Sequence, residues 1–251
     1  MDCLKEVAER LSRSRNAVAL TGAGISVESG IPDFRSPGGL WSRYDPLEYG
    51  HIASFRRNPG KVWRMILEMY RLVDAARPNP AHHALAQLEK RGILKAVVTQ
   101  NVDSLHQMAG SERVIEFHGH GRTLRCETCG ARYPRERASF DVMPPECGCG
   151  GVLRPDFVFF GEGIPPKAHH EAVAVTERAD VFLVIGTSAA VAPASYLPML
   201  AKSSGAYLVE INPEPTDLTC RLTDCHIAER AGVALPAVLE AMGIYAESRT
   251  L

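Results

Sequence analysis

Two pairs of cysteines between positions 126 and 149 have the spacing of a metal site. Cys126 and Cys129 form a Cys-x-x-Cys pair, and Cys147 and Cys149 form a Cys-x-Cys pair. Thiolates arranged in two close pairs are typical ligands of a tetrahedral zinc ion. Because these side chains would fill all four positions of the ion, we predict one structural zinc ion with no open site for chemistry. Unliganded thiols and a redox pair are the alternatives.

Five polar turns, each placed directly after a run of apolar residues, hold the other side chains that could do chemistry. They are Gly22-Ala23-Gly24, segments 99–106 and 116–120, Gly186-Thr187-Ser188 and Ile211-Asn212-Pro213. Small residues allow backbone N–H groups to approach a pyrophosphate. Amide and carboxylate side chains in segment 99–106 can hydrogen-bond a ribose or a carboxamide, and His118 is a candidate general base. Each turn alone has a steric explanation, but five together favour a ligand site.

The elements that must position these turns alternate between strand and helix. The apolar runs at 16–20, 93–99, 114–117, 181–185 and 207–211 predict short buried strands. Helical spacing of apolar residues appears at 2–14, 80–88, 171–178 and 236–242. Strands that alternate with helices predict an α/β fold with a Rossmann-like, doubly wound parallel sheet, whose strand ends line the ligand crevice.

Two stretches interrupt this alternation and predict a smaller inserted domain. Residues 41–78 contain a turn-rich lead and one amphipathic helix that starts near Asn58 and Pro59. Residues 121–154 contain the cysteines and a basic run. We therefore expect a small domain of helical and zinc-ribbon parts. The large domain would then comprise residues 1–40, 79–120 and 155–251.

Composition limits the class of protein. The 251 residues carry a formal net charge of -1, and 45% are hydrophobic and 23% charged, which excludes a disordered or collagen-like chain. The near-zero charge argues against direct nucleic-acid binding, and it favours a solvated face for the arginines around the cysteines. No segment predicts a signal peptide or a membrane span, so we expect a cytoplasmic protein with reduced cysteines. Cys3, Cys220 and Cys225 are expected to be plain thiols.

Taken together, these motifs resemble those of the sirtuins, the NAD-dependent protein lysine deacylases. The matching stretches are GAGISVESGIPDFRS at 22–36, TQNVDSLHQMAG at 99–110, EFHGH at 116–120, the four-cysteine module, LRPDFVFFGE at 153–162, GTS at 186–188 and INPEP at 211–215. They follow the order and spacing of the family and cover nearly the whole chain. The chain is similar to the bacterial and archaeal catalytic core of that family.

The resemblance implies that NAD binds in the crevice between the two domains. Gly22, Ala23 and Gly24 would hold the pyrophosphate, with Gly186, Thr187 and Ser188. The other implied cofactor contacts are Ile31, Asp33 and Phe34 in a closing loop, Arg35 at a phosphate, Gln100 at the nicotinamide ribose, Asn101, Val102 and Asp103 at the nicotinamide, Asn212 at the adenine ribose and Ala231 at the adenine. The edge near Ala231 fits less closely, because Glu229 stands where the family often has glycine.

The implied reaction consumes NAD and moves no hydride. The acyl oxygen of an acylated lysine attacks C1′ of the nicotinamide ribose, and nicotinamide leaves. His118 and Asn101 are the implied catalytic residues, with His118 as general base on a ribose hydroxyl. The products are free lysine, nicotinamide and O-acyl-ADP-ribose.

The resemblance also implies how the acylated protein binds. A substrate peptide would add as a strand to segment 157–162. The implied substrate contacts are Phe157, Val158, Phe159, Gly161 and Val191. In the branch that prefers succinyl-lysine or malonyl-lysine, a Tyr and an Arg three residues apart hold the acyl carboxylate. The corresponding positions here are Ile66 and Met69, which predicts an apolar acyl pocket.

Three rival functions stay open at this point. Mono-ADP-ribosyl transfer would use the same NAD site. A dehydrogenase is disfavoured, because Val27 stands where the G-x-G-x-x-G fingerprint needs a third glycine. A zinc-ribbon scaffold or nucleic-acid binder without catalysis is disfavoured by the presence of Gln100, Asn101, Asp103 and His118. No motif indicates the physiological substrates or the oligomeric state.

Overall fold

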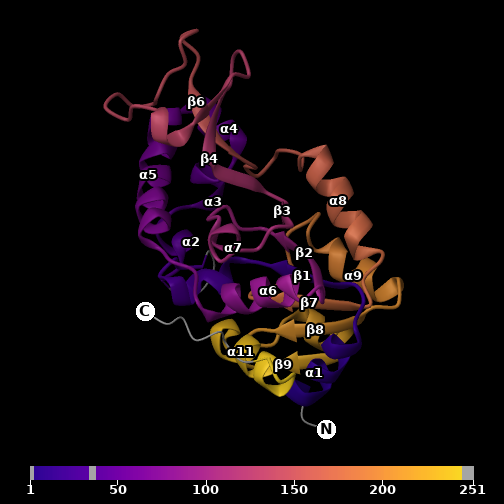
Figure 1. The fold of residues 1–251 in the computed structure, drawn as a ribbon. Coiled ribbons are helices and arrows are strands. Elements are labelled where there is room, and N and C mark those ends of the chain that lie inside the picture. The colour runs from indigo at the N-terminus through magenta and orange to yellow at the C-terminus, as the bar shows by residue number, and fades with distance from the viewer. Residues whose placement is uncertain (1–2, 34–37, 245–251) are drawn as a thin grey trace.

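A six-stranded sheet forms the centre of the larger part of the protein, in a computed structural model that describes residues 3–33 and 38–244 (Figure 1). Its strands are β1 (Ala17–Thr21), β2 (Leu94–Thr99), β3 (Val114–Glu116), β7 (Val181–Ile185), β8 (Tyr207–Ile211) and β9 (Cys225–Ile227). All neighbours pair in parallel, in the order β3-β2-β1-β7-β8-β9. The order reverses between β1 and β7, and ligand crevices of doubly wound sheets lie at such a switch point.

Helices cover both faces of this sheet, which confirms the predicted fold class. One face packs against α1 (Cys3–Arg13), α6 (Pro80–Lys90) and α11 (Ala231–Ala241). The other packs against α8 (Pro166–Thr176), α9 (Tyr196–Ser203) and α10 (Asp217–Arg221). Successive strand residues alternate between the two cores: Ala17 and Ala19 belong to the first, and Val18 and Leu20 to the second. The strands are buried on both faces, so their sequences are continuous apolar runs.

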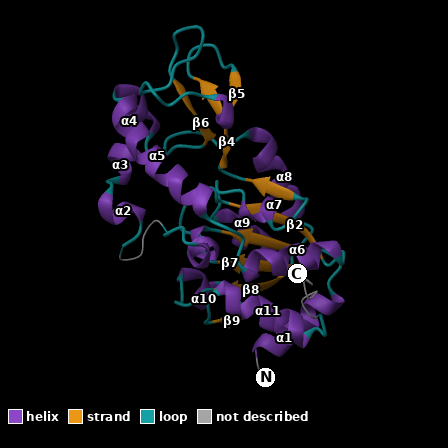
Figure 2. Cartoon of the chain, turned by 60° about the vertical axis from the view of Figure 1, so that its left-hand side comes forward, coloured by secondary structure: helices purple, strands orange, loops and turns teal. Residues whose placement is uncertain are grey.

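A second, three-stranded antiparallel sheet lies at the far end of the molecule, beside the inserted helices (Figure 2). Its strands are β4 (Gly119–Cys126), β5 (Arg132–Pro134) and β6 (Leu153–Phe157), and η2 (Arg135–Arg137) is a 3-10 turn after β5. The helices are α2 (Leu40–Arg43), α3 (Pro46–Tyr49), α4 (Ile52–Arg57) and α5 (Pro59–Ala75). Trp63 of α5 is fully buried, and its indole N–H donates to the Leu153 carbonyl at 2.9 Å. This contact joins the two inserted stretches in one core.

Several element boundaries differ from the sequence predictions. The turn-rich lead before α5 contains three short helices, and one of them, α3, is capped by Asp45, whose side chain accepts from the Leu47 N–H. Helix α8 begins at Pro166 rather than at 171, because a proline is well placed in a first helical turn. Helix α11 begins at Ala231, and Pro236 lies inside it rather than at its start.

The prediction that Cys3 and Cys225 are plain thiols is wrong. They form a disulfide with Cα atoms 6.0 Å apart, which ties the start of α1 to the edge strand β9. The two residues are separated by 222 positions in the sequence, so spacing alone could not pair them. Cys220 is free and exposed, as expected.

Candidate functional site

Two glycine turns at the carboxyl ends of β1 and β7 pack directly against each other. The Gly24 N–H donates to the Gly186 carbonyl at 2.8 Å. A Cβ atom at Gly24 would lie 2.7 Å from the Gly186 Cα, and one at Gly22 would lie 2.6 Å from the Thr187 Cβ. Larger residues would push the turns apart, so these glycines are required by packing. The same packing leaves small residues at the switch point, where a pyrophosphate can approach the backbone.

The amide residues that follow β2 are held over these turns. The Gln100 side-chain amide donates to the Thr187 hydroxyl at 3.0 Å. The Asn101 side chain is buried, and its amide donates to the Gly22 carbonyl at 3.0 Å and to the Ser26 hydroxyl at 3.2 Å. The structure therefore brings together turns that are far apart in the sequence, as predicted for one crevice.

Asp103 completes this polar cluster from the same loop. Its carboxylate accepts from the Ser26 hydroxyl at 2.7 Å and from the Leu105 N–H at 2.9 Å. Burial raises the pKa of Asp103, and these hydrogen bonds oppose the rise. Ser26, in the 3-10 turn η1 (Ala23–Ser29), contacts both Asn101 and Asp103. Ser26 belongs to the stretch 22–36 but was given no role in the sequence predictions. Its hydroxyl, two residues after the glycine turn, was the feature that could have indicated one.

Buried threonines and a histidine lie beneath this cluster. The Thr21 hydroxyl donates to the Thr99 hydroxyl at 2.9 Å, and the Asn101 N–H donates to the same Thr99 oxygen at 3.1 Å. His106 Nε2 lies 2.9 Å from the Thr21 oxygen, and burial lowers the pKa of His106 to about 3. The neutral ring thus anchors the ends of β1 and β2, a role that the sequence did not reveal.

His118 follows β3 and stands beside Gln100. Its Nδ1 lies 3.1 Å from the Gln100 carbonyl oxygen, which can only accept, so Nδ1 carries the proton and Nε2 keeps its lone pair. Burial lowers the pKa of His118, and the hydrogen bond to Gln100 opposes this. The His118 carbonyl accepts from the Val158 N–H at 2.9 Å, which places the histidine next to the predicted peptide segment.

The remaining predicted cofactor residues follow strands of the parallel sheet at their carboxyl ends or lie outside the described part. Half-buried Val102 shares the loop with Asn101, and exposed Ser188 follows Thr187. The Asn212 N–H donates to the Ile227 carbonyl at 3.2 Å after β8. Ala231 opens α11, where Glu28 accepts from the Gly232 N–H at 2.8 Å. Ile31 and Asp33 are described, whereas Phe34 and Arg35 lie outside the described residues.

The predicted peptide segment 157–162 is paired to the inserted helices along one edge. The Phe160 N–H donates to the Gly50 carbonyl at 2.9 Å, and the Phe160 carbonyl accepts from the Ile52 N–H at 3.0 Å. Phe159 is only 3% exposed, because it packs against Phe55 and Phe157. Gly161 has a φ of 83° and packs against His51. The Phe159 N–H and carbonyl are both hydrogen-bonded within the segment, to the side chain and the N–H of Glu162. Val191 is half-buried in the loop before α9.

The four predicted metal ligands come together in space. Their sulfur atoms all lie within 4.8 Å of one another, with 3.6 Å between Cys126 and Cys149 and 3.7 Å between Cys129 and Cys147. A zinc ion with Zn–S bonds of about 2.3 Å gives sulfur–sulfur edges of about 3.8 Å. Backbone N–H groups of Thr128 and Cys129 donate to the Cys126 sulfur, which favours a thiolate. The residues therefore fit a tetrahedral zinc ion.

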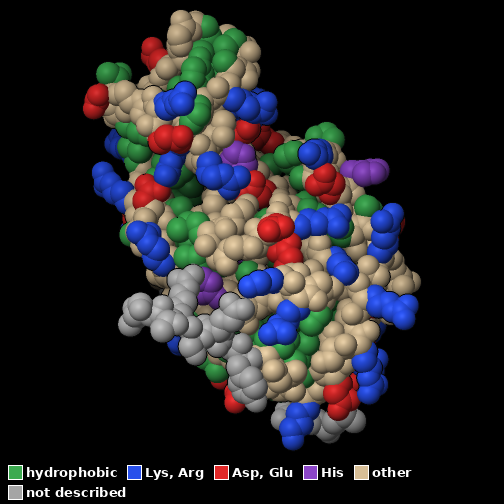
Figure 3. Space-filling model, in the orientation of Figure 1, with side chains coloured by type: hydrophobic (Ala, Val, Ile, Leu, Met, Phe, Trp, Pro, Cys, Tyr) green, Lys and Arg blue, Asp and Glu red, His purple; other side chains and the backbone are tan. Residues whose placement is uncertain are grey.

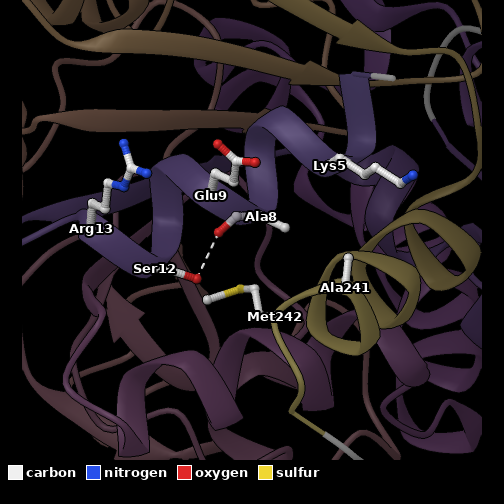
Figure 4. Close-up of a pocket in the computed structure, with 7 residues that line it drawn as sticks. All are labelled: Lys5, Ala8, Glu9, Ser12, Arg13, Ala241 and Met242. Atoms are coloured by element: carbon white, nitrogen blue, oxygen red, sulfur yellow. Dashed lines mark hydrogen bonds between the residues drawn. The ribbon is translucent and has the colours of Figure 1, made fainter. Parts of the chain in front are cut away.

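Two pockets in the described part of the protein differ in whether they adjoin the predicted site residues. One of about 480 Å³ lies between α1 and the end of α11 and contains none of the predicted site residues (Figure 4). It is lined by Lys5, Ala8, Glu9, Ser12, Arg13, Ala241 and Met242. The other, of about 300 Å³, lies between α5 and the Asp103 loop, and Met69, Tyr70 and Val102 contribute to its wall. Only the second pocket adjoins the site. No helix in the described part of the chain is long and apolar enough to cross a membrane.

The basic run around the cysteines is neutralised by acids, and the face in Figure 3 shows both signs interspersed. Arg122 pairs with Glu116, and Arg135 pairs with Asp74. Arg125 and Arg132 share Asp156, with closest N–O distances of 3.8 Å and 2.8 Å. These arginines therefore form ion pairs with acidic residues of the same protein.

Comparison with known proteins matches the same segments. A model of the Sir2 family matches residues 22–193. A protein of Aeropyrum pernix named NAD-dependent protein deacylase is 49% identical over 243 residues, 94% of this chain and 98% of that protein. NAD-dependent protein deacylase 2 of Pyrobaculum aerophilum is 48% identical over 235 residues, 93% of this chain and 94% of that protein. A solved Sir2 structure with a deacetylated p53 peptide and 3′-O-acetyl ADP-ribose aligns with a TM-score of 0.91 at 38% identity, covering 96% of this chain and 99% of that one.

Proposed function

The chain belongs to the Sir2 family, and from this premise we propose that it is an NAD-dependent protein lysine deacylase. It transfers the acyl group of acyl-lysine to ADP-ribose and releases nicotinamide. The observation that carries this function is the meeting of Gln100, Asn101 and Asp103 with a neutral His118 at the carboxyl edge of the parallel sheet. That arrangement offers an amide pocket for a carboxamide beside a base for a ribose hydroxyl.

The roles of the individual residues are part of the proposal. Gly22, Ala23 and Gly24 border the pyrophosphate, with Thr187 and Ser188 beside it. Asn101 and Asp103 receive the nicotinamide, and Gln100 holds its ribose. His118 Nε2 takes the proton of the ribose hydroxyl that attacks the acyl carbon. The peptide binds as an added strand along segment 157–162, and the loop of Val191 lies on its other side.

The domain division and the place of action are also proposals. We divide the chain into an NAD-binding domain (1–40, 79–120 and 155–251) and a small domain (41–78 and 121–154). Separate cores support two parts, and Leu40, Phe157 and Phe159 at the boundaries pack into the core of the small one. We keep the cytoplasm as the proposed location: the four cysteines of the cluster are free thiols, whereas a disulfide such as Cys3–Cys225 is uncommon in a reducing compartment. The pairing of the arginines with acids supports the absence of direct nucleic-acid binding.

The function is tested by the dependence of nicotinamide release on the acyl group. We expect NAD and an acetyl-lysine peptide to give nicotinamide, free lysine and O-acetyl-ADP-ribose in equal amounts. The same peptide with unmodified lysine is the control and should release at least about a hundredfold less nicotinamide, because the attacking acyl oxygen is missing. Equal release with both peptides, together with labelling of protein by ADP-ribose, would instead establish mono-ADP-ribosyl transfer.

The acyl pocket is expected to be apolar. Ile66 is fully buried, and Met69 and Val102 lie on the wall of the 300 Å³ pocket. Arg122 and Arg135 also line this pocket, and each is paired with a carboxylate. Tyr70 is buried and Arg71 is exposed, so these neighbours point to different faces and cannot both hold one carboxylate.

The double variant Ile66→Tyr, Met69→Arg should therefore gain activity on succinyl-lysine. A charged fork in this position binds a carboxylate, and we expect kcat/KM on a succinyl peptide to rise by about tenfold or more. The Met69→Leu variant is the matched control and should keep the acetyl activity. A folded double variant, checked by its melting temperature because Tyr is larger than Ile, that shows no gain contradicts this pocket assignment.

A further inference from the structure

One fully buried arginine contacts three points of the peptide-binding segment. Arg154 of β6 is 1% exposed. Its Nη1 and Nη2 donate to the two carboxylate oxygens of Glu162 at 2.6 Å and 2.7 Å, as a bidentate pair. Nη2 also donates to the Phe157 carbonyl, and the guanidinium carbon lies 4.6 Å from the centre of the Phe159 ring. The two ends and the middle of segment 157–162 are thus attached to one side chain.

Glu162 uses the same carboxylate to shape the turn of this segment. It accepts from the Phe159 N–H at 3.0 Å, while its own N–H donates to the Phe159 carbonyl at 3.1 Å. Burial raises the pKa of Glu162, but the hydrogen bonds from Arg154 and Phe159 outweigh this and lower its pKa. The carboxylate therefore stays ionised and keeps both partners. Gly161 lies inside this turn, and a Cβ atom there would lie 2.7 Å from the His51 ring.

Arg154 also connects the segment to the cysteine cluster. Its Nη1 lies 3.5 Å from a carboxylate oxygen of Glu127, the residue that follows Cys126. The other oxygen of Glu127 lies 2.9 Å from Nε of Arg56 in α4. A line of ion pairs thus runs from Arg56 of α4 through Glu127, the chain neighbour of Cys126, to Arg154 and the peptide segment.

We propose that Arg154 is a positioning residue for substrate binding: it holds segment 157–162 in the shape that pairs with the acyl-lysine peptide, and through Glu127 it makes that shape depend on the cysteine cluster. This inference rests on the proposed deacylase function. Loss of the cysteine cluster should therefore weaken peptide binding without weakening NAD binding. Within the described residues, the hydrogen bonds and ion pairs of Arg154 join it to its own sheet, to Glu162 and to Glu127, and not to the glycine turns or the Asn101 loop.

The test is a comparison of Michaelis constants in the Arg154→Lys variant. Lysine keeps the positive charge but cannot form the planar bidentate fork. We expect the KM for an acetyl-lysine peptide to rise about tenfold or more, because the segment loses its fixed shape, while the KM for NAD stays within about twofold. The matched control is Arg132→Lys: Arg132 pairs with Asp156 on the same small sheet, but its side chain is 61% exposed. It should change the peptide KM by less than about twofold.

Hydrogen exchange gives a second readout that does not need activity. In Arg154→Lys, the backbone amides of residues 157–162 should exchange faster than in the wild type, whereas those of β1 and β7 should not change. Glu162→Gln should give the same pattern and replaces Arg154→Lys if that variant does not fold. Glu127→Gln should give a smaller rise of the peptide KM.

The outcomes separate the two proposals. If the wild type releases no nicotinamide with the acetyl peptide, the function is wrong, and the exchange of residues 157–162 still decides whether Arg154 orders the segment. If the wild type is active but a folded Arg154→Lys leaves the peptide KM unchanged, or raises both KM values equally, the positioning role is overturned.

Discussion

Replacing His118 by alanine is expected to lower kcat for deacylation by about 10²- to 10⁴-fold, the usual contribution of a general base. The two nitrogens of the His118 ring have different roles in the structure. Nδ1 donates to the Gln100 carbonyl at 3.1 Å, so Nε2 keeps a lone pair that can accept a proton. Removal of the ring leaves the ribose hydroxyl without a base but opens no large cavity in either main core, because His118 is half-buried at a strand end.

The measurement is steady-state release of O-acetyl-ADP-ribose, with the melting temperature as a check of folding. The His170→Ala variant is the control, because His170 is an exposed histidine on α8. It should keep its activity within about twofold, as is usual for exposed positions. A folded His118→Ala variant that keeps more than about a tenth of the wild-type kcat would show that another group is the base.

The lowered pKa of His118 gives this prediction a pH dependence. The base works only when it is neutral, and burial disfavours its charged form. The acid limb of the kcat/KM profile should therefore lie below pH 6.5, the ordinary value for histidine. Activity falls as the pH drops through the folded-state pKa and is retained above it. An acid limb above 6.5 would show that a different group controls the reaction.

The central sheet was predictable because its strands are buried on both faces. Continuous apolar runs such as 181–185 have no other ready explanation, and the predicted run coincides with β7. Strand β9 was missed because Cys225–Ile227 has only three residues and lies at the sheet edge. The zinc-ribbon part was predicted, but its individual strands were not, because β4 combines two glycines with two arginines and its sequence lacks an apolar alternation.

The parts of the site that consist of local sequence motifs could be predicted from the sequence. The contacts between residues distant in the sequence could not. The glycine turns and the amide loop are visible as motifs, and the structure brings them together. The contact between Thr21 and Thr99 spans 78 positions, and the contact between Thr21 and His106 spans 85. Arg154 and Glu162 are only eight positions apart, yet their pairing depends on a turn that no local pattern indicates. Side-chain networks of this kind need the fold before they can be identified.

Removal of the zinc ion is expected to unfold the small antiparallel sheet and to abolish deacylation with it. Structural zinc contributes about 10–16 kcal/mol to the folding of isolated zinc-finger peptides. Here the loss is expected to be smaller, at several kcal/mol, because the inserted helices and the sheet also share a core around Trp63 and Phe55. The ion links the hairpin of Cys126 to the loop of Cys147, and in the described part of that loop the regular pairing is sparse, with an isolated bridge between Glu146 and Val152.

The measurement combines metal analysis, hydrogen exchange and activity after treatment with a strong chelator. We expect one zinc per chain before treatment, and fast exchange of residues 121–154 afterwards, with β1 and β7 still protected. Cys126→Ser should reproduce this effect, whereas Cys220→Ser should not, because Cys220 is an exposed thiol outside the cluster. Peptide binding should be lost before NAD binding, since Glu127 and Arg154 connect the cluster to segment 157–162. If the metal-free protein kept unchanged hydrogen exchange and unchanged activity, the cysteine cluster would not be needed to support the site.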